Sequence, residues 1–178
     1  MHSGETVSSY MLNGAIGCLL SEETTAKSLR KRFIFKIIPM LNPDGVRYGN
    51  YRCSLLGVDL NRRWDNPDMY LHPTIYYTKK MMQAFHEKHS VEVFCDMHGH
   101  TKKQNVFIYG CSEKSIDYLD MRKNLCVKVL PILMENNPFF KYADCHFRME
   151  SLKMSTARIV MYREIEIFNS YTMEASFF

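Results

Sequence analysis

The chain has 178 residues, of which 46% are hydrophobic and 24% are charged, so it can bury the core of one domain and is far from the composition of disordered segments. Its formal net charge is +4, a basic excess that suits acidic partners but is too small to indicate nucleic-acid binding. No apolar run is long enough to cross a membrane, so we expect neither a nucleic-acid nor a membrane partner.

Six cysteines are spread along the chain without a C-x-x-C pair. Most of them lie in apolar segments, which favours free, buried thiols in a reducing compartment over a disulfide framework. At the start of the chain, charge and glycine come before any hydrophobic stretch, so no secretory signal is predicted. We therefore expect a cytosolic protein.

The first residues combine a candidate metal-binding pair with the start of a helix. His2 and Glu5 bracket Gly4 and can reach one point in space from a tight turn. A neutral imidazole and a carboxylate are half of a catalytic zinc site, although this spacing is common by chance and two surface polar side chains explain it as well. Apolar residues at roughly helical spacing then predict a helix over residues 8–20.

The next segments predict a strand followed by a long loop. Residues 33–39 are aromatic and β-branched and predict a buried strand. Asn42-Pro43-Asp44-Gly45 is typical of a turn. Residues 46–68 then predict a polar loop, and loops of this length in a compact domain are often functional. This loop contains Arg47, Arg52, Arg62 and Arg63.

The rest of the chain alternates between helical and strand patterns. We predict helices at residues 73–89 and 116–134, the second interrupted by Pro131, and strands at residues 91–97, 105–109, 158–165 and 171–177. Residues 138–153 are rich in aromatic side chains and are predicted to be irregular. Strands separated by helical stretches predict an α/β fold, with helices packed on the faces of a sheet.

Histidines at the end of a predicted strand could complete the metal site. His98 and His100 follow the strand at residues 91–97, at the end where α/β sheets place their ligands. One of them would complete a His-Glu-His set, and Asp96 could orient an imidazole. A histidine that hydrogen-bonds to backbone at a strand end is an equally good interpretation of His98.

Other polar residues could act on a substrate. Glu174 is a carboxylate in an apolar strand, which makes it either a candidate general base or an edge-strand residue that faces solvent. In the polar loop, Asn61 and Arg62 could hold a carboxylate, and Arg52 could stabilise an oxyanion. Taken singly, such arginines are more often solvated surface charges.

In their order along the chain, these motifs resemble the zinc metallocarboxypeptidases of the M14 type and, within them, the cytosolic carboxypeptidase subfamily. The matching stretches are His2-Ser3-Gly4-Glu5-Thr6, Asn42-Pro43-Asp44-Gly45-Val46, Gly49-Asn50-Tyr51-Arg52-Cys53, Gly57-Val58-Asp59-Leu60-Asn61-Arg62-Arg63-Trp64, Asp96-Met97-His98-Gly99-His100 and Asn169-Ser170-Tyr171-Thr172-Met173-Glu174. The resemblance implies a mixed, mostly parallel twisted sheet flanked by helices. It also implies that residues 1–178 are part of the family's catalytic domain, incomplete at both ends.

The resemblance implies a role for each metal-binding and catalytic residue. His2, Glu5 and His98 would bind one zinc ion, which selects His98 over His100. Glu174 would be the general base that activates water and later protonates the leaving amine. Arg52 would polarise the carbonyl group of the peptide bond that is cleaved.

The resemblance also implies how a substrate is held. Asn61 and Arg62 would bind the C-terminal carboxylate, and Arg158 is the best match for a basic residue that favours acidic side chains. The implied substrates are C-terminal or side-chain glutamates of acidic proteins such as tubulin. We expect a monomer that deglutamylates these tails in the cytosol or on microtubules.

Two features depart from the subfamily pattern, and two other functions stay open. Ser3 stands where the subfamily usually has proline, and the tyrosine that covers the substrate has two candidates, Tyr162 and Tyr171.

The alternative functions are a zinc deacylase of N-acyl amino acids, which shares the His-x-x-Glu…His set, and a non-catalytic, truncated homologue that binds acidic tails. The Asn61-Arg62 loop and the strand before Glu174 favour the carboxypeptidase.

Overall fold

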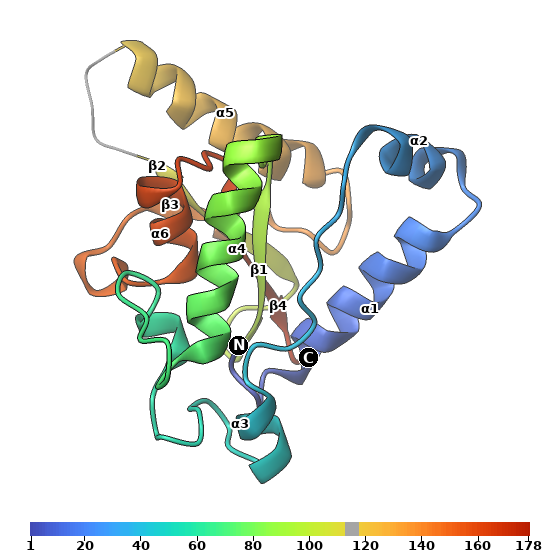
Figure 1. The fold of residues 1–178 in the computed structure, drawn as a ribbon. Helices are drawn as coiled ribbons and strands as arrows, with labels where there is room; N and C mark the ends of the chain where they lie inside the picture. Colours follow the sequence, from blue (N-terminus) through green and yellow to red (C-terminus); the bar gives the residue numbers. More distant parts are fainter. Residues whose placement is uncertain (113–117) are drawn as a thin grey trace.

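A four-stranded mixed sheet forms the middle of the molecule in a computed structural model that describes residues 1–112 and 118–178 (Figure 1). The strands are β1 (Phe94–His100), β2 (Val106–Ser112), β3 (His146–Arg148) and β4 (Ser170–Ser176), in the spatial order β1-β4-β2-β3. β1 pairs with β4 and β2 with β3 in parallel, whereas β2 and β4 are antiparallel. The predicted α/β fold with a mostly parallel sheet is confirmed.

Helices cover the sheet, with α4 in front of β1 in Figure 1. The helices are α1 (Thr6–Leu20), α2 (Thr24–Arg32), α3 (Pro43–Tyr48), α4 (Pro73–His89), α5 (Tyr118–Met134) and α6 (Ala157–Glu164). Short 3₁₀ turns occur at Leu60–Arg62, Tyr142–Asp144 and Ser151–Lys153. No helix among the described residues is long and apolar enough to cross a membrane.

The main core lies between α4, α6 and the end of the long loop. Trp64, Ile75 and Met161 are fully buried there, and burying each such side chain contributes about 1.5–3 kcal/mol. The buried ammonium of Lys79 donates to the carbonyls of Trp64 and Asp65 and pairs with Glu164 at 2.6 Å. The loop is therefore tied to both helices, which fixes the residues that precede Trp64.

The opposite face of the sheet packs against α5 without the predicted interruption at Pro131. This proline lies inside the helix and lacks the N–H that would donate to the carbonyl of Val127. The Tyr171 hydroxyl donates to that carbonyl from β4, at 2.8 Å. The sheet thus supplies the missing hydrogen-bond donor. Ile116, in the predicted first turn of this helix, lies outside the described residues.

The predicted strand at residues 158–165 is wrong, because this segment forms α6. All residues from Ala157 to Tyr162 are buried. The helix is enclosed by the sheet on one side and by Trp64 and Ile75 on the other. A helix that is buried all round shows no polar face, so its apolar, β-branched sequence matches a strand pattern.

The predicted buried strand at residues 33–39 is also wrong. The segment belongs to no helix or strand, and its apolar side chains are exposed, Ile34 by 64%. Apart from a hydrogen bond from the amide of Phe33 back to α2, no backbone pairing is described for it. Residues 46–68 also differ from a plain loop, since they contain the end of α3 and a 3₁₀ turn.

The helix predicted at residues 73–89 is confirmed with the same bounds, and the strand predicted at residues 171–177 is confirmed with each end one residue earlier. All six cysteines are free, as predicted. Their predicted burial is wrong for exposed residues such as Cys18 and Cys126, whereas Cys111 is buried. The free thiols therefore do not share one buried environment.

Candidate metal site and catalytic cleft

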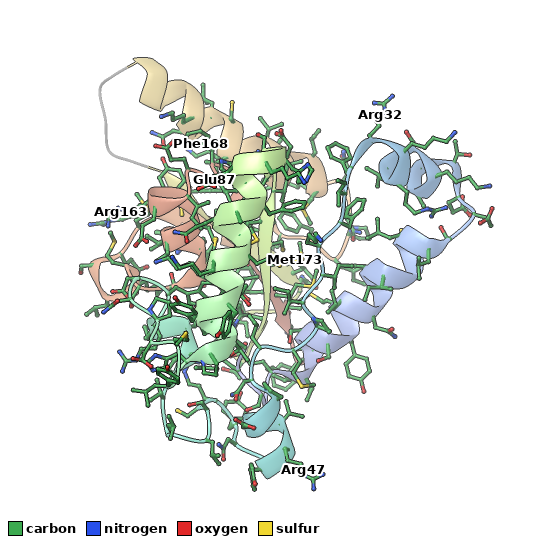
Figure 2. The ribbon with its side chains drawn as sticks, in the orientation of Figure 1. Arg32, Arg47, Glu87, Arg163, Phe168 and Met173 are labelled. Atoms are coloured by element: carbon green, nitrogen blue, oxygen red, sulfur yellow. The ribbon has the colours of Figure 1, made fainter. Side chains whose placement is uncertain are left out.

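All eight residues predicted to bind metal or substrate, or to catalyse, line one cleft of about 300 Å³. They are His2, Glu5, Arg52, Asn61, Arg62, His98, Arg158 and Glu174. They come from the N-terminal turn, the long loop, α6 and two adjacent strands of the sheet. Arg47 of the same loop lies instead at the tip of α3, far from the sheet (Figure 2).

The N-terminal turn brings His2 and Glu5 together. The amide of Glu5 donates to the carbonyl of His2 at 3.2 Å, and α1 begins at the next residue. Gly4 packs directly on Tyr51, where a Cβ atom would come within 2.3 Å of the ring. Only glycine fits this close approach, which explains its place between the two candidate ligands.

The candidate metal site is the group formed by His2, Glu5 and His98. The Nδ1 atoms of His2 and His98 lie 2.7 and 2.8 Å from the two carboxylate oxygens of Glu5. All three residues are buried, and their potential ligand atoms lie within 4.8 Å of one another. Two imidazoles and one carboxylate are the protein ligands of a common class of catalytic zinc site, so the residues fit this ion.

Two further carboxylates orient the histidines. Asp59 lies 3.1 Å from Nε2 of His2, and Asp96 lies 2.7 Å from Nε2 of His98. Each Nδ1 atom is thereby left to face the centre of the site. Sequence reasoning anticipated Asp96 from its place on the strand but gave Asp59 no role.

The charges of this group are strongly coupled. Burial opposes ionisation of Glu5 and Asp59, but the neighbouring histidines, and Arg52 for Asp59, hold the pKa of both carboxyls well below the usual range. Burial also opposes protonation of His98, yet Asp96 and Glu5 raise its pKa to about 10. A proton on His98 therefore competes with a metal ion for the site.

Arg52 is held at the rim by Asp59. Its Nε atom donates to Asp59 at 2.9 Å, and its Nη2 atom lies 2.7 Å from the same carboxylate. The remaining Nη1 atom lies 3.7 Å from Glu5 and 3.4 Å from His2. One edge of the guanidinium is thus fixed, while the other faces the metal site.

Asn61 and Arg62 differ in how free they are to meet a substrate. The Asn61 carboxamide accepts from the amide of Ala157 at 2.9 Å, and its nitrogen lies 3.3 Å from Nε2 of His98. Asn61 therefore joins α6 to the metal site as well as lining the cleft. Arg62 donates to the carbonyl of Asn61, and no described carboxylate pairs with it.

Glu174 lies opposite His98 on the paired strand β4, and both side chains project from the same face of the sheet. Burial, together with the charges of Glu5 and Asp96, raises the pKa of Glu174 to about 7. A carboxylate whose pKa is close to neutral is suited to accept and return a proton.

Arg158 occupies the second position of α6 and is only 4% exposed. Its guanidinium donates to the carbonyl of Gly110 and lies 3.5 Å from the sulfur of Cys111. No carboxylate of the described residues pairs with it. A buried cation without an anionic partner is costly, which makes the site favourable for an anionic ligand.

Neither tyrosine proposed to cover the substrate lines the cleft. Tyr171 lies on the opposite face of the sheet against α5, and Tyr162 packs on Phe168 in the core. The tyrosines that do line the cleft are Tyr51 and Tyr109. Tyr109 and Lys153 were not predicted as cleft residues from the sequence. The alternation of side chains along β2 could have indicated Tyr109, whereas Lys153 lies in an irregular segment that carries no such pattern.

Comparisons with known proteins agree with this geometry. The family described as zinc carboxypeptidase matches residues 1–174. The chain is 47% identical to cytosolic carboxypeptidase 1 of Xenopus laevis and 46% identical to cytosolic carboxypeptidase 2 of Danio rerio, over 99% of its own length. It spans only 15% and 24% of these two relatives.

Solved structures show the same fold. A carboxypeptidase from Burkholderia mallei superposes with a TM-score of 0.82 at 23% identity, covering 99% of this chain and 46% of the other. At this low identity the similarity shows a shared fold only. Membership of the family is shown by the family match, which covers residues 1–174. The chain belongs to the zinc carboxypeptidase family.

Proposed function

We propose that this protein is a zinc-dependent carboxypeptidase that removes glutamate residues from acidic protein tails, such as those of tubulin, in the cytosol. The observation that supports it most is the position of Glu174. This residue lines the cleft opposite His98 of the buried His2-Glu5-His98 set, and its pKa is raised toward neutrality. A metal site built from two histidines and one carboxylate, beside a proton acceptor, suits the hydrolysis of peptide bonds.

The chemistry divides between the ion and the protein. Bound zinc supplies Lewis acidity, which makes water a nucleophile near neutral pH. Glu174 accepts the proton of the attacking water and returns it to the leaving amine. A positioned general base of this kind contributes about 10²- to 10⁴-fold in rate.

The arginines of the loop place and polarise the substrate. The free edge of Arg52 donates to the carbonyl oxygen as it gains negative charge, and its other edge stays fixed on Asp59. Arg62, which has no carboxylate partner among the described residues, binds the terminal carboxylate together with Asn61. Recognition of that carboxylate restricts cleavage to the last peptide bond.

The charge of the cleft supports an acidic substrate. Arg158 is a buried cation that lines the cleft without a carboxylate partner in the described part of the chain. A glutamate side chain in its vicinity would supply the missing anion. A deacylase of N-acyl amino acids with uncharged side chains would offer no such anion to Arg158.

Zinc content and glutamate release test the proposal. The purified chain is incubated with zinc and, in separate reactions, with a peptide that ends in several glutamates, a peptide that ends in several glutamines and an N-acetyl amino acid. We expect one zinc ion per chain and release of free glutamate but little glutamine. Bound zinc without release would identify a non-catalytic homologue, and release of N-acyl groups alone would identify a deacylase. Either outcome overturns the proposal.

A further inference from the structure

Tyr109 forms the wall of the cleft next to the general base. It lies on β2 opposite Thr172, and the residue two positions before it, Phe107, lies opposite Glu174. The Tyr109 side chain therefore projects from the same face as Glu174 and lines the same cleft. No described residue hydrogen-bonds to its hydroxyl group, which leaves this group available to a ligand.

Cations surround the Tyr109 ring. The ammonium of Lys153 lies 5.4 Å from the ring centroid, and that of Lys103 lies 6.0 Å away. Lys153 lines the cleft together with Arg158, whereas Lys103 does not. Arg158 is close enough for its charge to act on the Tyr109 phenol. Two cations and one hydroxyl thus converge at this end of the cleft.

The two cleft cations differ in how they are held. Arg158 is fixed by the Gly110 carbonyl, whereas Lys153 pairs with Glu150 at 3.0 Å in an ion pair whose side chains are 37% and 48% exposed. An exposed pair three residues apart contributes little to stability. The flexible Lys153 side chain can therefore leave Glu150 for a carboxylate in the cleft without a large loss.

We propose that Lys153 and the Tyr109 hydroxyl complete, with Arg158, a pocket for the side-chain carboxylate of a substrate glutamate. The assignment rests on the proposed function, because it names the specificity residues of the same cleft. Lys153 and Tyr109 distinguish glutamate from glutamine, since both contacts gain from a negative charge that the amide lacks. Glu150 is the internal competitor that the substrate carboxylate displaces.

The test compares glutamate with glutamine in two measurements. Calorimetry gives the dissociation constants of the free amino acids for the zinc-loaded chain, and peptides that end in either residue give kcat/KM. Lys153→Met is expected to lower the preference for glutamate about fivefold to tenfold, and Tyr109→Phe about threefold to fivefold. Glu150→Gln is expected to tighten glutamate binding, because it frees Lys153. Lys80→Met removes the same charge from the exposed side of α4. It is expected to change the preference for glutamate over glutamine neither in the dissociation constants nor in kcat/KM.

The outcomes separate this inference from the proposed function. An unchanged glutamate preference in Lys153→Met, as in Lys80→Met, would overturn the pocket even in an active enzyme. If the chain binds glutamate through Lys153 but cleaves no peptide, the proposed function fails and the pocket stands. A variant that folds poorly would bind glutamate and glutamine equally weakly, so the preference for glutamate would not change. Glu150→Gln is expected to strengthen glutamate binding, which damage to folding cannot do, so this variant still reports on Lys153. Weaker glutamate binding in Glu150→Gln would also count against the pocket.

Discussion

His98 and Glu174 lie directly opposite each other on the parallel strands β1 and β4, but the side chain of His98 is held by neighbouring carboxylates and that of Glu174 is not. His98 is 3% exposed and contacts carboxylates through both ring nitrogens. The carboxylate of Glu174 has no hydrogen-bond partner among the described residues and faces the cleft. The pairing places a fixed metal ligand next to a carboxylate that is free to exchange a proton.

Replacing Glu174 by glutamine should separate metal binding from turnover. Glutamine keeps the size of the side chain but cannot accept the proton of the attacking water, so we expect kcat to fall about 10²- to 10⁴-fold. Zinc content, measured by atomic absorption, should stay at one ion per chain. Glu92→Gln, at an exposed position, is the matched control. A variant that kept its turnover would show that another group is the base.

The same substitution should change how the stability of the metal-free protein depends on pH. Burial raises the folded-state pKa of Glu174 to about 7 from 4.5, so the folded chain holds a proton that the unfolded chain loses between these values. The stability contributed by that proton is present below pH 4.5 and is lost as pH rises through 7. Relative to wild type, Glu174→Gln should therefore gain up to about 3 kcal/mol between pH 4.5 and pH 8.

Urea unfolding of the two metal-free proteins at pH 4.5 and pH 8 measures this difference. Other titrating groups are common to both proteins and cancel in the comparison. A stability difference between wild type and variant that is the same at both pH values would contradict a raised pKa at Glu174.

The sequence allowed the ligands to be predicted because their motifs are local. His2 and Glu5 share one turn, and His98 and Glu174 each lie near the C-terminal end of a strand whose apolar segment is visible in the sequence. The register that brings His98 opposite Glu174, 76 positions later, depends on the pairing of β1 with β4, which no local pattern specifies. Asp59 was missed for the same reason, since its contact with His2 spans 57 residues.

The wrong elements share a physical cause, which is the environment rather than the local propensity. The apolar run of α6 is enclosed on all sides, so it carries no helical periodicity. The apolar run at residues 33–39 has strand propensity, but a strand needs a partner, and none pairs with it among the described residues. In both segments the composition was interpreted correctly as apolar, and the tertiary contacts decided the conformation.

Zinc affinity should rise with pH, because the ion must displace the proton of His98. Asp96 and Glu5 raise the pKa of His98 to about 10 despite its burial, so the imidazole is protonated in the metal-free protein at neutral pH. Between pH 6 and 8 we expect the apparent dissociation constant to fall about tenfold per pH unit. Competition with a chelator measures the affinity, and calorimetry in buffers of different ionisation enthalpy counts the released proton. An affinity that is independent of pH would contradict a protonated His98.

Replacing Asp59 by asparagine should release Arg52 while leaving most of the metal site in place. The asparagine oxygen can still accept from His2 and from the amide of Asn61, as Asp59 Oδ1 does. Its amide nitrogen would instead face the Arg52 guanidinium, which loses both contacts to Oδ2. We expect zinc affinity to fall no more than about tenfold and kcat/KM to fall about 10²-fold.

A double-mutant cycle with Arg52→Met distinguishes this positioning effect from a direct one. If Asp59 acts by holding Arg52, then adding Asp59→Asn to Arg52→Met should cost little further activity. Losses that multiply in the double variant would show that Asp59 and Arg52 act independently. Asp44→Asn, at an exposed position on α3, serves as the control for the loss of a carboxylate charge.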